Sequence, residues 1–253
     1  MLNITSMGAG PDLVLLHGWG LNQAIWQGVV EQLASHHTLH FVDLPGYGTN
    51  NGWAGLQDLN TITQAVINSV PEGAVWLGWS LGGMVALNAA AEGANISKLI
   101  ITASSPKFCQ GGDWHAGIEP QVLEQFADDL KENHKLTLLR FLALQARGSD
   151  KARDEIRILR ESVFVHGEPS AKTLAAGLDI LQYDDLRLTA PHINQPTLVI
   201  YGLRDTLIPV EAIDWFAHNL SHCSIKEIIG AGHAPFLSHP EQFIAAIDRF
   251  CDE

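Results

Sequence analysis

Short apolar runs that alternate with helical patterns are the sequence feature that most limits how this chain can fold. Each run is bounded by Gly, Pro, Asn or Asp or by a helix start, which is typical of buried strands. In the first part of the chain the runs lie at residues 13–16, 39–42, 74–77 and 99–103. Helical patterns lie at residues 24–33, 59–69 and 81–91. This alternation predicts an α/β fold with a mostly parallel sheet and helices on both faces.

A helical insertion interrupts the alternation. Residues 119–182 contain helical patterns and no convincing strand. The alternation then resumes, with strands expected at residues 197–201 and 225–229 and helices at residues 210–219 and 240–250. We therefore predict three segments: a first core part at residues 1–109, a helical cap at 110–187 and a second core part at 188–253.

Composition excludes several classes of protein. The chain has 253 residues, of which 46% are hydrophobic and 17% charged, so it can bury a large core. Its formal net charge of −13 repels phosphate groups, and we expect no nucleic acid and no membrane as partner. Three widely spaced cysteines are typical of free thiols in a reducing compartment, and no basic residue precedes Lys98 to form a secretory signal. We expect a cytoplasmic monomer.

The string Gly78-Trp79-Ser80-Leu81-Gly82 matches the G-x-S-x-G pattern of a nucleophilic serine on a sharp turn from strand to helix. A strand is expected directly before it and a helix directly after it, as the pattern requires. A Cβ at Gly78 or Gly82 would collide with the neighbouring chain in so tight a turn. We predict that Ser80 is the nucleophile; the alternative is a serine that only caps the helix.

A serine hydroxyl is a weak nucleophile unless a base removes its proton. His233 lies in a loop between the strand expected at residues 225–229 and the helix expected at 240–250. From there an imidazole can reach over the carboxyl edge of the sheet, and it titrates near neutrality as a general base should. We predict His233 as the base.

An acid that orients the base is expected after another strand. Asp205 follows the strand predicted at residues 197–201, so it can hold the imidazole in one tautomer. The resulting chain order of serine, aspartate and histidine is the one expected for a serine on such a turn. Asp184 and Asp185 are weaker candidates because they follow no strand, and Asp205 itself could simply form a turn.

Ester or amide chemistry also needs donors for the developing oxyanion. The backbone N–H of Leu81, directly after the nucleophile, is the first candidate. The second is expected in the loop after the strand at residues 13–16, which reads His17-Gly18-Trp19-Gly20. The two glycines let this backbone turn inward, so we predict the Trp19 N–H as the second donor and His17 as a support of the loop; the alternative is a plain glycine turn with a packed tryptophan.

Metal and nucleotide chemistry have little support. Histidines cluster in two places, at His36, His37 and His40 and at His218 and His222 beside Cys223. A catalytic metal would need a third ligand that converges with the others and usually an acidic base nearby, and neither is evident. The chain also has no H-E-x-x-H, G-x-G-x-x-G or Walker motif. We expect no metal and no cofactor.

The expected cap is unusually basic for so acidic a chain. Residues 131–160 hold 8 of the 15 basic residues, and Arg153, Arg157 and Arg160 are spaced to share one helix face. Such a stripe can dock an acidic partner, or it can be a solvated helix face. The apolar run at residues 141–145 could line a cavity for an acyl chain, or it could only pack the cap onto the core.

Five strings carry a family resemblance: residues 15–22 (LLHGWGLN), 42–46 (VDLPG), 76–83 (WLGWSLGG), 140–145 (RFLALQ) and 234–240 (APFLSHP). With these strings the chain resembles the α/β-hydrolase superfamily over nearly its full length. The third and fourth strings are more specific, and through them it is similar to the pimeloyl-[acyl-carrier protein] methyl ester esterases of biotin synthesis.

The resemblance implies a cytoplasmic serine carboxylesterase without a cofactor, which removes the methyl group of a pimeloyl ester carried on acyl carrier protein. It matches the family's catalytic residues with Ser80, Asp205 and His233. It matches the family's substrate contacts with Trp19, Ser80, Leu81, Phe141, Leu142, Ala143, Leu144, Gln145 and His233. The basic residues that meet the carrier protein match Arg140, Arg153 and Arg157, whereas a further arginine position of the family is Leu136 here.

Two other activities fit the same residues. A general short-chain carboxylesterase or a carbon–carbon bond hydrolase would use the same three side chains. A ligand receptor that has kept the fold would bind tightly without turnover, since fold alone does not determine function.

Overall fold

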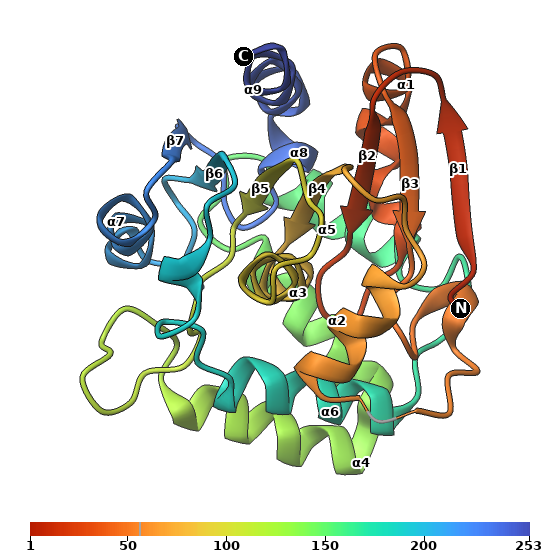
Figure 1. Cartoon of the computed structure of the whole chain (residues 1–253). Coiled ribbons are helices and arrows are strands. Elements are labelled where there is room, and N and C mark those ends of the chain that lie inside the picture. Colours follow the sequence, from red (N-terminus) through yellow and green to blue (C-terminus); the bar gives the residue numbers. More distant parts are fainter. Residues whose placement is uncertain (56) are drawn as a thin grey trace.

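A seven-stranded sheet forms the centre of the computed structural model, which describes residues 1–55 and 57–253 (Figure 1). The strands are β1 (Ile4–Gly8), β2 (Asp12–Leu16), β3 (Thr38–Val42), β4 (Val75–Trp79), β5 (Lys98–Thr102), β6 (Thr197–Gly202) and β7 (Cys223–Ile228). Their spatial order is β1-β3-β2-β4-β5-β6-β7. All neighbours pair in parallel except β1, which is antiparallel to β3. The predicted α/β class and mostly parallel sheet are therefore confirmed.

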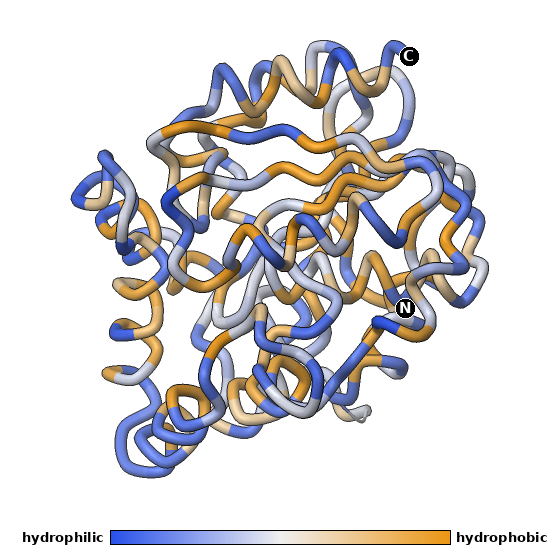
Figure 2. Tube along the Cα trace, turned by 90° about the vertical axis from the view of Figure 1, so that its left-hand side faces the viewer, coloured by the Kyte–Doolittle hydropathy of each residue, from blue (hydrophilic) through white to orange (hydrophobic). Residues whose placement is uncertain are grey.

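Helices cover both faces of this sheet. They are α1 (Gln27–Ala34), α2 (Leu59–Ile67), α3 (Leu81–Ala91), α7 (Val210–Asn219), α8 (Pro235–Ser238) and α9 (Pro240–Asp252). Short 3₁₀ turns add Gln23–Trp26, Gly48–Asn50 and Ala190–His192. Helices α1 and α9 pack against each other on one face, and α2 and α3 do so on the other (Figure 1). Hydrophobic residues follow the strands through the middle of the molecule, between the more polar outer helices (Figure 2).

The buried strands form because most of their residues are apolar, on both faces of the strand. Leu13, Val14, Leu15 and Leu16 are all completely buried, as expected for a strand with helices on both sides. Strand β1 was missed by the sequence analysis. It lies at the sheet edge, mostly exposed, and its sequence Ile-Thr-Ser-Met-Gly lacks the apolar run of an interior strand.

Three further helices, here called the cap helices, separate β5 from β6 in the sequence. They are α4 (Pro120–Gln145), α5 (Ala152–Ser162) and α6 (Ala171–Tyr183). Helix α4 has a non-helical backbone at Asn133 and packs along α6, below the sheet in Figure 1. No helix in the described ranges is long and apolar enough to cross a membrane.

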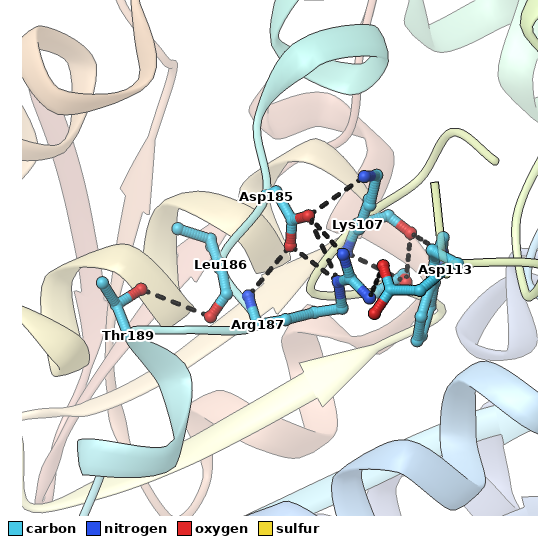
Figure 3. Close-up of polar contacts among 8 residues, drawn as sticks. Lys107, Asp113, Asp185, Leu186, Arg187 and Thr189 are labelled. Atoms are coloured by element: carbon cyan, nitrogen blue, oxygen red, sulfur yellow. Dashed lines mark hydrogen bonds and ion pairs between the residues drawn. The ribbon is translucent and has the colours of Figure 1, made fainter. Parts of the chain in front are cut away.

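Ionic contacts join the segments through which the chain leaves and re-enters the sheet (Figure 3). Asp185 pairs with Lys107 at 3.0 Å and with Arg187 at 2.8 Å, and Arg187 also pairs with Asp113 at 3.0 Å. Burial opposes the ionisation of Asp185, but hydrogen bonds from Arg187 and Lys107 outweigh it and lower the pKa to about 2. Asp185, a weaker candidate for the acid, is thus engaged in these ion pairs.

Candidate active site

Ser80 occupies the sharp turn between β4 and α3. Its φ of 55° lies in the left-handed region, which is strained for a residue with a side chain. The turn is held because the Ser80 carbonyl accepts hydrogen bonds from Gly83 N at 2.9 Å and Ser104 Oγ at 2.7 Å. A Cβ on Gly82 would lie 2.5 Å from Leu16 O, so only glycine fits there. The turn therefore presents the Ser80 hydroxyl at the start of α3, beyond the carboxyl end of β4.

Three side chains from distant parts of the chain form a hydrogen-bonded line. His233 Nε2 lies 3.0 Å from Ser80 Oγ, and His233 Nδ1 lies 2.8 Å from Asp205 Oδ2. Ser80 is 3% exposed and His233 is 1% exposed, and the Asp205 side chain is fully buried. With its Nδ1–H donated to the carboxylate, the imidazole has Nε2 free to accept the serine proton. The structure thus brings together the three residues predicted for catalysis.

The acid is itself fixed by its own loop. Asp205 Oδ1 accepts the backbone N–H of Leu207 at 2.8 Å and that of Ile208 at 3.1 Å. These bonds hold one carboxylate oxygen, so the other is directed at His233. The loop follows β6, as the sequence predicts.

Trp79, which precedes the nucleophile, positions the base as well. Its indole Nε1–H donates to the His233 carbonyl at 2.8 Å, and its ring centroid lies 5.8 Å from that of the imidazole. The G-x-S-x-G pattern predicts no role for Trp79, because its second position accepts any side chain. The available signal is that a buried indole needs an acceptor for its N–H, so a tryptophan here is expected to bond to a neighbouring loop.

The loop after β2 lies directly against the nucleophile. A Cβ on Gly18 would be 3.3 Å from the Ser80 Cβ and 3.1 Å from the Trp79 ring, so the backbone here approaches as closely as glycine allows. The Leu81 N–H is at the first position of α3, where no helical acceptor exists. Both predicted oxyanion donors, Trp19 N and Leu81 N, therefore belong to backbone segments that adjoin Ser80.

His17 holds the peptide that carries one of these donors. Its Nδ1 lies 2.8 Å from Gly18 O, and its Nε2 accepts the Leu44 N–H at 2.9 Å, so Nδ1 carries the proton. Gly18 O and Trp19 N belong to the same planar peptide group, so fixing the one orients the other. Burial lowers the pKa of His17, against opposing effects of Asp43 and the Gly18 carbonyl, which favours the neutral ring that this pattern requires.

The cap helices close over this loop through apolar contacts. The Trp19 and Phe141 rings lie 4.6 Å apart, and Trp19 Nε1 donates to Leu174 O on α6 at 2.8 Å. Of the predicted acyl-binding run, Phe141, Leu142 and Gln145 are buried, whereas Ala143 and Leu144 are partly exposed. Both polar atoms of the Gln145 side chain are buried without a hydrogen-bond partner in the described part of the chain. Such an amide is available to a ligand.

A surface hollow of about 560 Å³ lies between α4 and α5. Seven apolar residues and two arginines line it: Val122, Phe126, Arg140, Ala143, Leu144, Ala146, Arg147, Ala152 and Ile156. The partly exposed members of the predicted acyl-binding run thus face this hollow. It offers an apolar surface with cationic groups beside it.

The predicted docking arginines come from two of the cap helices: Arg140 lies on α4 and lines this hollow, and Arg153 and Arg157 lie on α5. Arg140 pairs with Asp129 at 3.3 Å, and Arg157 pairs with Glu161 at 3.2 Å, all on exposed helix faces. Arg153 is exposed and has no ion pair within residues 1–55 and 57–253. Leu136, which also lies on α4, is 45% exposed.

Comparison with known proteins identifies the family. Residues 13–246 match the family described as "Alpha/beta hydrolase family". The pimeloyl-[acyl-carrier protein] methyl ester esterase of Vibrio vulnificus (strain YJ016) is 44% identical over 96% of this chain and 94% of its own length. That of Xanthomonas campestris pv. campestris (strain B100) is 42% identical over 98% of both chains. The chain belongs to the alpha/beta hydrolases and, within them, to the family of these esterases.

Solved structures confirm the fold of this family member. An esterase from Exiguobacterium antarcticum superposes with a TM-score of 0.88 at 23% identity, covering 100% of this chain and 96% of that one. The enol-lactonase from Burkholderia xenovorans LB400 gives a TM-score of 0.86 at 20% identity with the same coverage. At such identity the likeness establishes the fold and not the substrate.

Proposed function

We propose that this protein hydrolyses the methyl ester of pimeloyl-[acyl-carrier protein] in biotin synthesis. The observation that carries the proposal is the hydrogen-bonded line from Ser80 through His233 to Asp205, in a chain 42–44% identical to esterases named for that reaction. The names of the relatives support the choice of substrate, and the hydrogen-bonded line of side chains supports the mechanism of hydrolysis.

Acylation begins when Ser80 Oγ attacks the ester carbonyl carbon. His233 Nε2 takes the hydroxyl proton, and Asp205 stabilises the imidazolium that results. The carbonyl oxygen gains negative charge and is held by the N–H groups of Leu81 and Trp19. When the tetrahedral intermediate collapses, the imidazolium gives its proton to the leaving methoxide, and methanol departs.

Deacylation repeats these steps with water as the nucleophile. His233 removes a proton from water, the hydroxide attacks the acyl-Ser80 carbonyl, and the same two N–H groups hold the oxyanion. The proton then passes to Ser80 Oγ, and the free carboxylic acid leaves. No cofactor is required, because each proton that the base removes is returned to a leaving oxygen.

The cap helices supply the substrate contacts in this proposal. Trp19, Leu81 and residues 141–145 line the path of the acyl chain, with Phe141 packed against Trp19 and the unpaired Gln145 amide available to a polar group of the substrate. Arg140, Arg153 and Arg157 meet an acidic carrier protein beside the hollow between α4 and α5. The cap comprises residues 110–187, and residues 1–109 and 188–253 form the core.

Two measurements on one variant test the proposal. A fluorophosphonate probe should label wild-type protein and leave Ser80→Ala unlabelled, since only an activated serine reacts. Wild-type protein should also turn over the carrier-bound methyl ester faster than short p-nitrophenyl esters and should restore growth without biotin to a strain that lacks its esterase, whereas Ser80→Ala should not. Equal labelling of both proteins would contradict the nucleophile. A preference for the short esters would favour a general esterase, and tight ligand binding without turnover would favour a receptor.

A further inference from the structure

The corner between α4 and α5, residues 147–155, lies against both loops that carry the partners of Ser80. Asp150 N donates to Gly230 O at 3.1 Å, in the loop before His233. A Cβ on Gly232 would lie 3.2 Å from the Ser149 Cβ, so the corner adjoins the residue next to the base. On the other loop, Gly148 packs against the carbonyl of Arg204, the neighbour of Asp205. Residues 147–155 of the cap thus contact both the loop that carries Asp205, here called the acid loop, and the loop that carries His233, here called the base loop.

Glu155 is the buried polar centre of this corner. It lies in the first turn of α5 and is completely buried, which is rare for a carboxylic acid. Its Oε1 accepts the Ser149 hydroxyl at 2.5 Å. Its Oε2 has no hydrogen-bond partner in the described ranges. Burying a carboxyl group with an unpartnered oxygen lowers the free energy of unfolding. Glu155 is therefore a candidate for a functional role and not for a purely stabilising one.

The base loop supplies the other surroundings of this carboxyl. Helix α8, which begins two residues after His233, packs against α5, and its Ser238 hydroxyl donates to Ala234 O at 3.4 Å. Burial raises the pKa of Glu155 and the charge of Asp150 adds to that rise, while Ser149, Ser238 and His233 oppose it. Ser149, which the carboxyl holds by a hydrogen bond, lies against Gly232, the residue next to the base.

We propose that Glu155 is a positioning residue, which acts through Ser149 to hold the loop that carries His233, so that the imidazole stays within hydrogen-bond distance of Ser80. The proposal rests on the ester hydrolysis proposed above, because it needs Ser80, His233 and Asp205 to act together in catalysis. It does not depend on the identity of the carrier-bound substrate. Because α5 also carries Arg153 and Arg157 on its exposed side, the helix joins the docking surface to the base.

Substitution of a positioning residue has a different kinetic effect from substitution of a residue that only packs in the core. Loss of packing alone lowers stability and leaves the folded enzyme with an unaltered turnover number. Loss of positioning lowers kcat while KM changes little, because the base is displaced and the acyl contacts are not. A displacement of the order of 1 Å at a catalytic group typically costs about 100-fold in rate.

The test uses full-length protein and a short p-nitrophenyl ester, a substrate that needs no carrier protein. Glu155→Leu should lower kcat by about 10- to 100-fold with KM close to wild type. Glu155→Gln keeps an acceptor for Ser149 and should restore most of that loss. Asp154→Asn, on the same turn of α5 but exposed, is the matched control and should behave as wild type.

Two outcomes would overturn the proposal: a folded Glu155→Leu with wild-type kcat, or a kcat loss that Glu155→Gln does not recover. If Glu155→Leu does not fold, Ser149→Ala removes the donor without removing the carboxyl and should still lower kcat with KM unchanged; a wild-type kcat in that variant would equally refute it. Wild-type protein that cleaves the short ester but not the carrier-bound ester would defeat the proposed substrate and leave the role of Glu155 standing.

Discussion

The loops at the carboxyl edge of the sheet and the cap helices are built by different means. The loops are held by directed hydrogen bonds, such as those from Ser104 to Ser80 and from Trp79 to His233, and by glycines that nothing larger can replace. The cap helices pack through apolar side chains such as Phe141 and keep their charged residues exposed. Directed bonds tolerate little displacement, whereas apolar contacts can be rearranged.

This difference separates reactivity from selectivity. In the proposed mechanism the nucleophile, the base, the acid and both oxyanion donors come from core loops, and the proposed acyl and carrier contacts come mainly from the cap helices. Substitutions in the loops should therefore lower kcat for every ester. Substitutions in the cap should change which ester is preferred, and Glu155 is the expected exception because we propose that it positions the base from the cap side.

The largest effect is expected at the acid. Asp205→Asn cannot hold the His233 tautomer that leaves Nε2 free, so kcat should fall by about 10,000-fold for short and carrier-bound esters alike. The fold should persist, because the amide oxygen can still accept the N–H groups of Leu207 and Ile208. Steady-state kinetics with both substrates and circular dichroism would measure these two results.

Asp185→Asn is the matched control for this substitution. Asp185 pairs with Lys107 and Arg187 where the chain re-enters the sheet, so its loss should lower stability and leave kcat near the wild-type value. A larger loss of kcat in Asp185→Asn than in Asp205→Asn would contradict the assignment of the acid.

The next largest effect is expected where the cap helices contact the loop after β2. Phe141→Ala removes a ring that is 2% exposed and packed against Trp19, which should cost about 3 kcal/mol of unfolding free energy and raise KM for long acyl esters. Ser80 labelling by a small fluorophosphonate should keep its rate, because no directed bond of the triad is lost. Urea unfolding and labelling kinetics would check both, with the exposed Leu136→Ala on the same helix as control; slower labelling would show that cap and triad are not separable here.

Much of the fold could be predicted because interior strands and helices carry local patterns. Helix α3 has the predicted bounds, and six of the strands lie within two residues of the predicted ranges. Strand β1 could not be predicted, since an exposed edge strand needs no apolar run.

The candidate site also contains residues that could be predicted from the sequence and contacts that could not. Ser80, Asp205 and His233 follow strands whose ends must meet at one sheet edge, so their proximity could be inferred from order alone. The bond from Trp79 to His233 joins residues 154 positions apart, and Asp150 N of the cap donates to Gly230 O in the loop before His233. Such pairings depend on how helices pack, and a single sequence does not reveal that.

A smaller effect is expected on the cap surface. Reversing two charges with Arg153→Glu and Arg157→Glu should lower kcat/KM for the carrier-bound ester by about 10-fold, since each exposed pairing contributes about 1 kcal/mol or less. The short ester should be hydrolysed at the wild-type rate. Lys226→Glu combined with Arg249→Glu, two exposed reversals on β7 and α9, is the control that changes the net charge by the same amount. Higher salt should reduce the difference between the proteins, and equal losses in the variant and the control would mean that no local docking surface exists.

The smallest effect concerns the stability of the core loop itself. Burial lowers the pKa of His17, so as the pH falls below the ordinary imidazole value of 6.5 the unfolded chain takes up a proton that the folded ring does not. Wild-type protein should therefore lose stability on account of His17 as the pH falls from 6.5. His17→Gln, though less stable at pH 7.5, should show a shallower slope in urea unfolding at these pH values. His37, whose pKa burial also lowers, is present in both proteins, so its contribution cancels in the difference. Parallel slopes would mean that His17 is protonated in the fold, and the bond from Leu44 N–H that orients the oxyanion loop would then have to be abandoned.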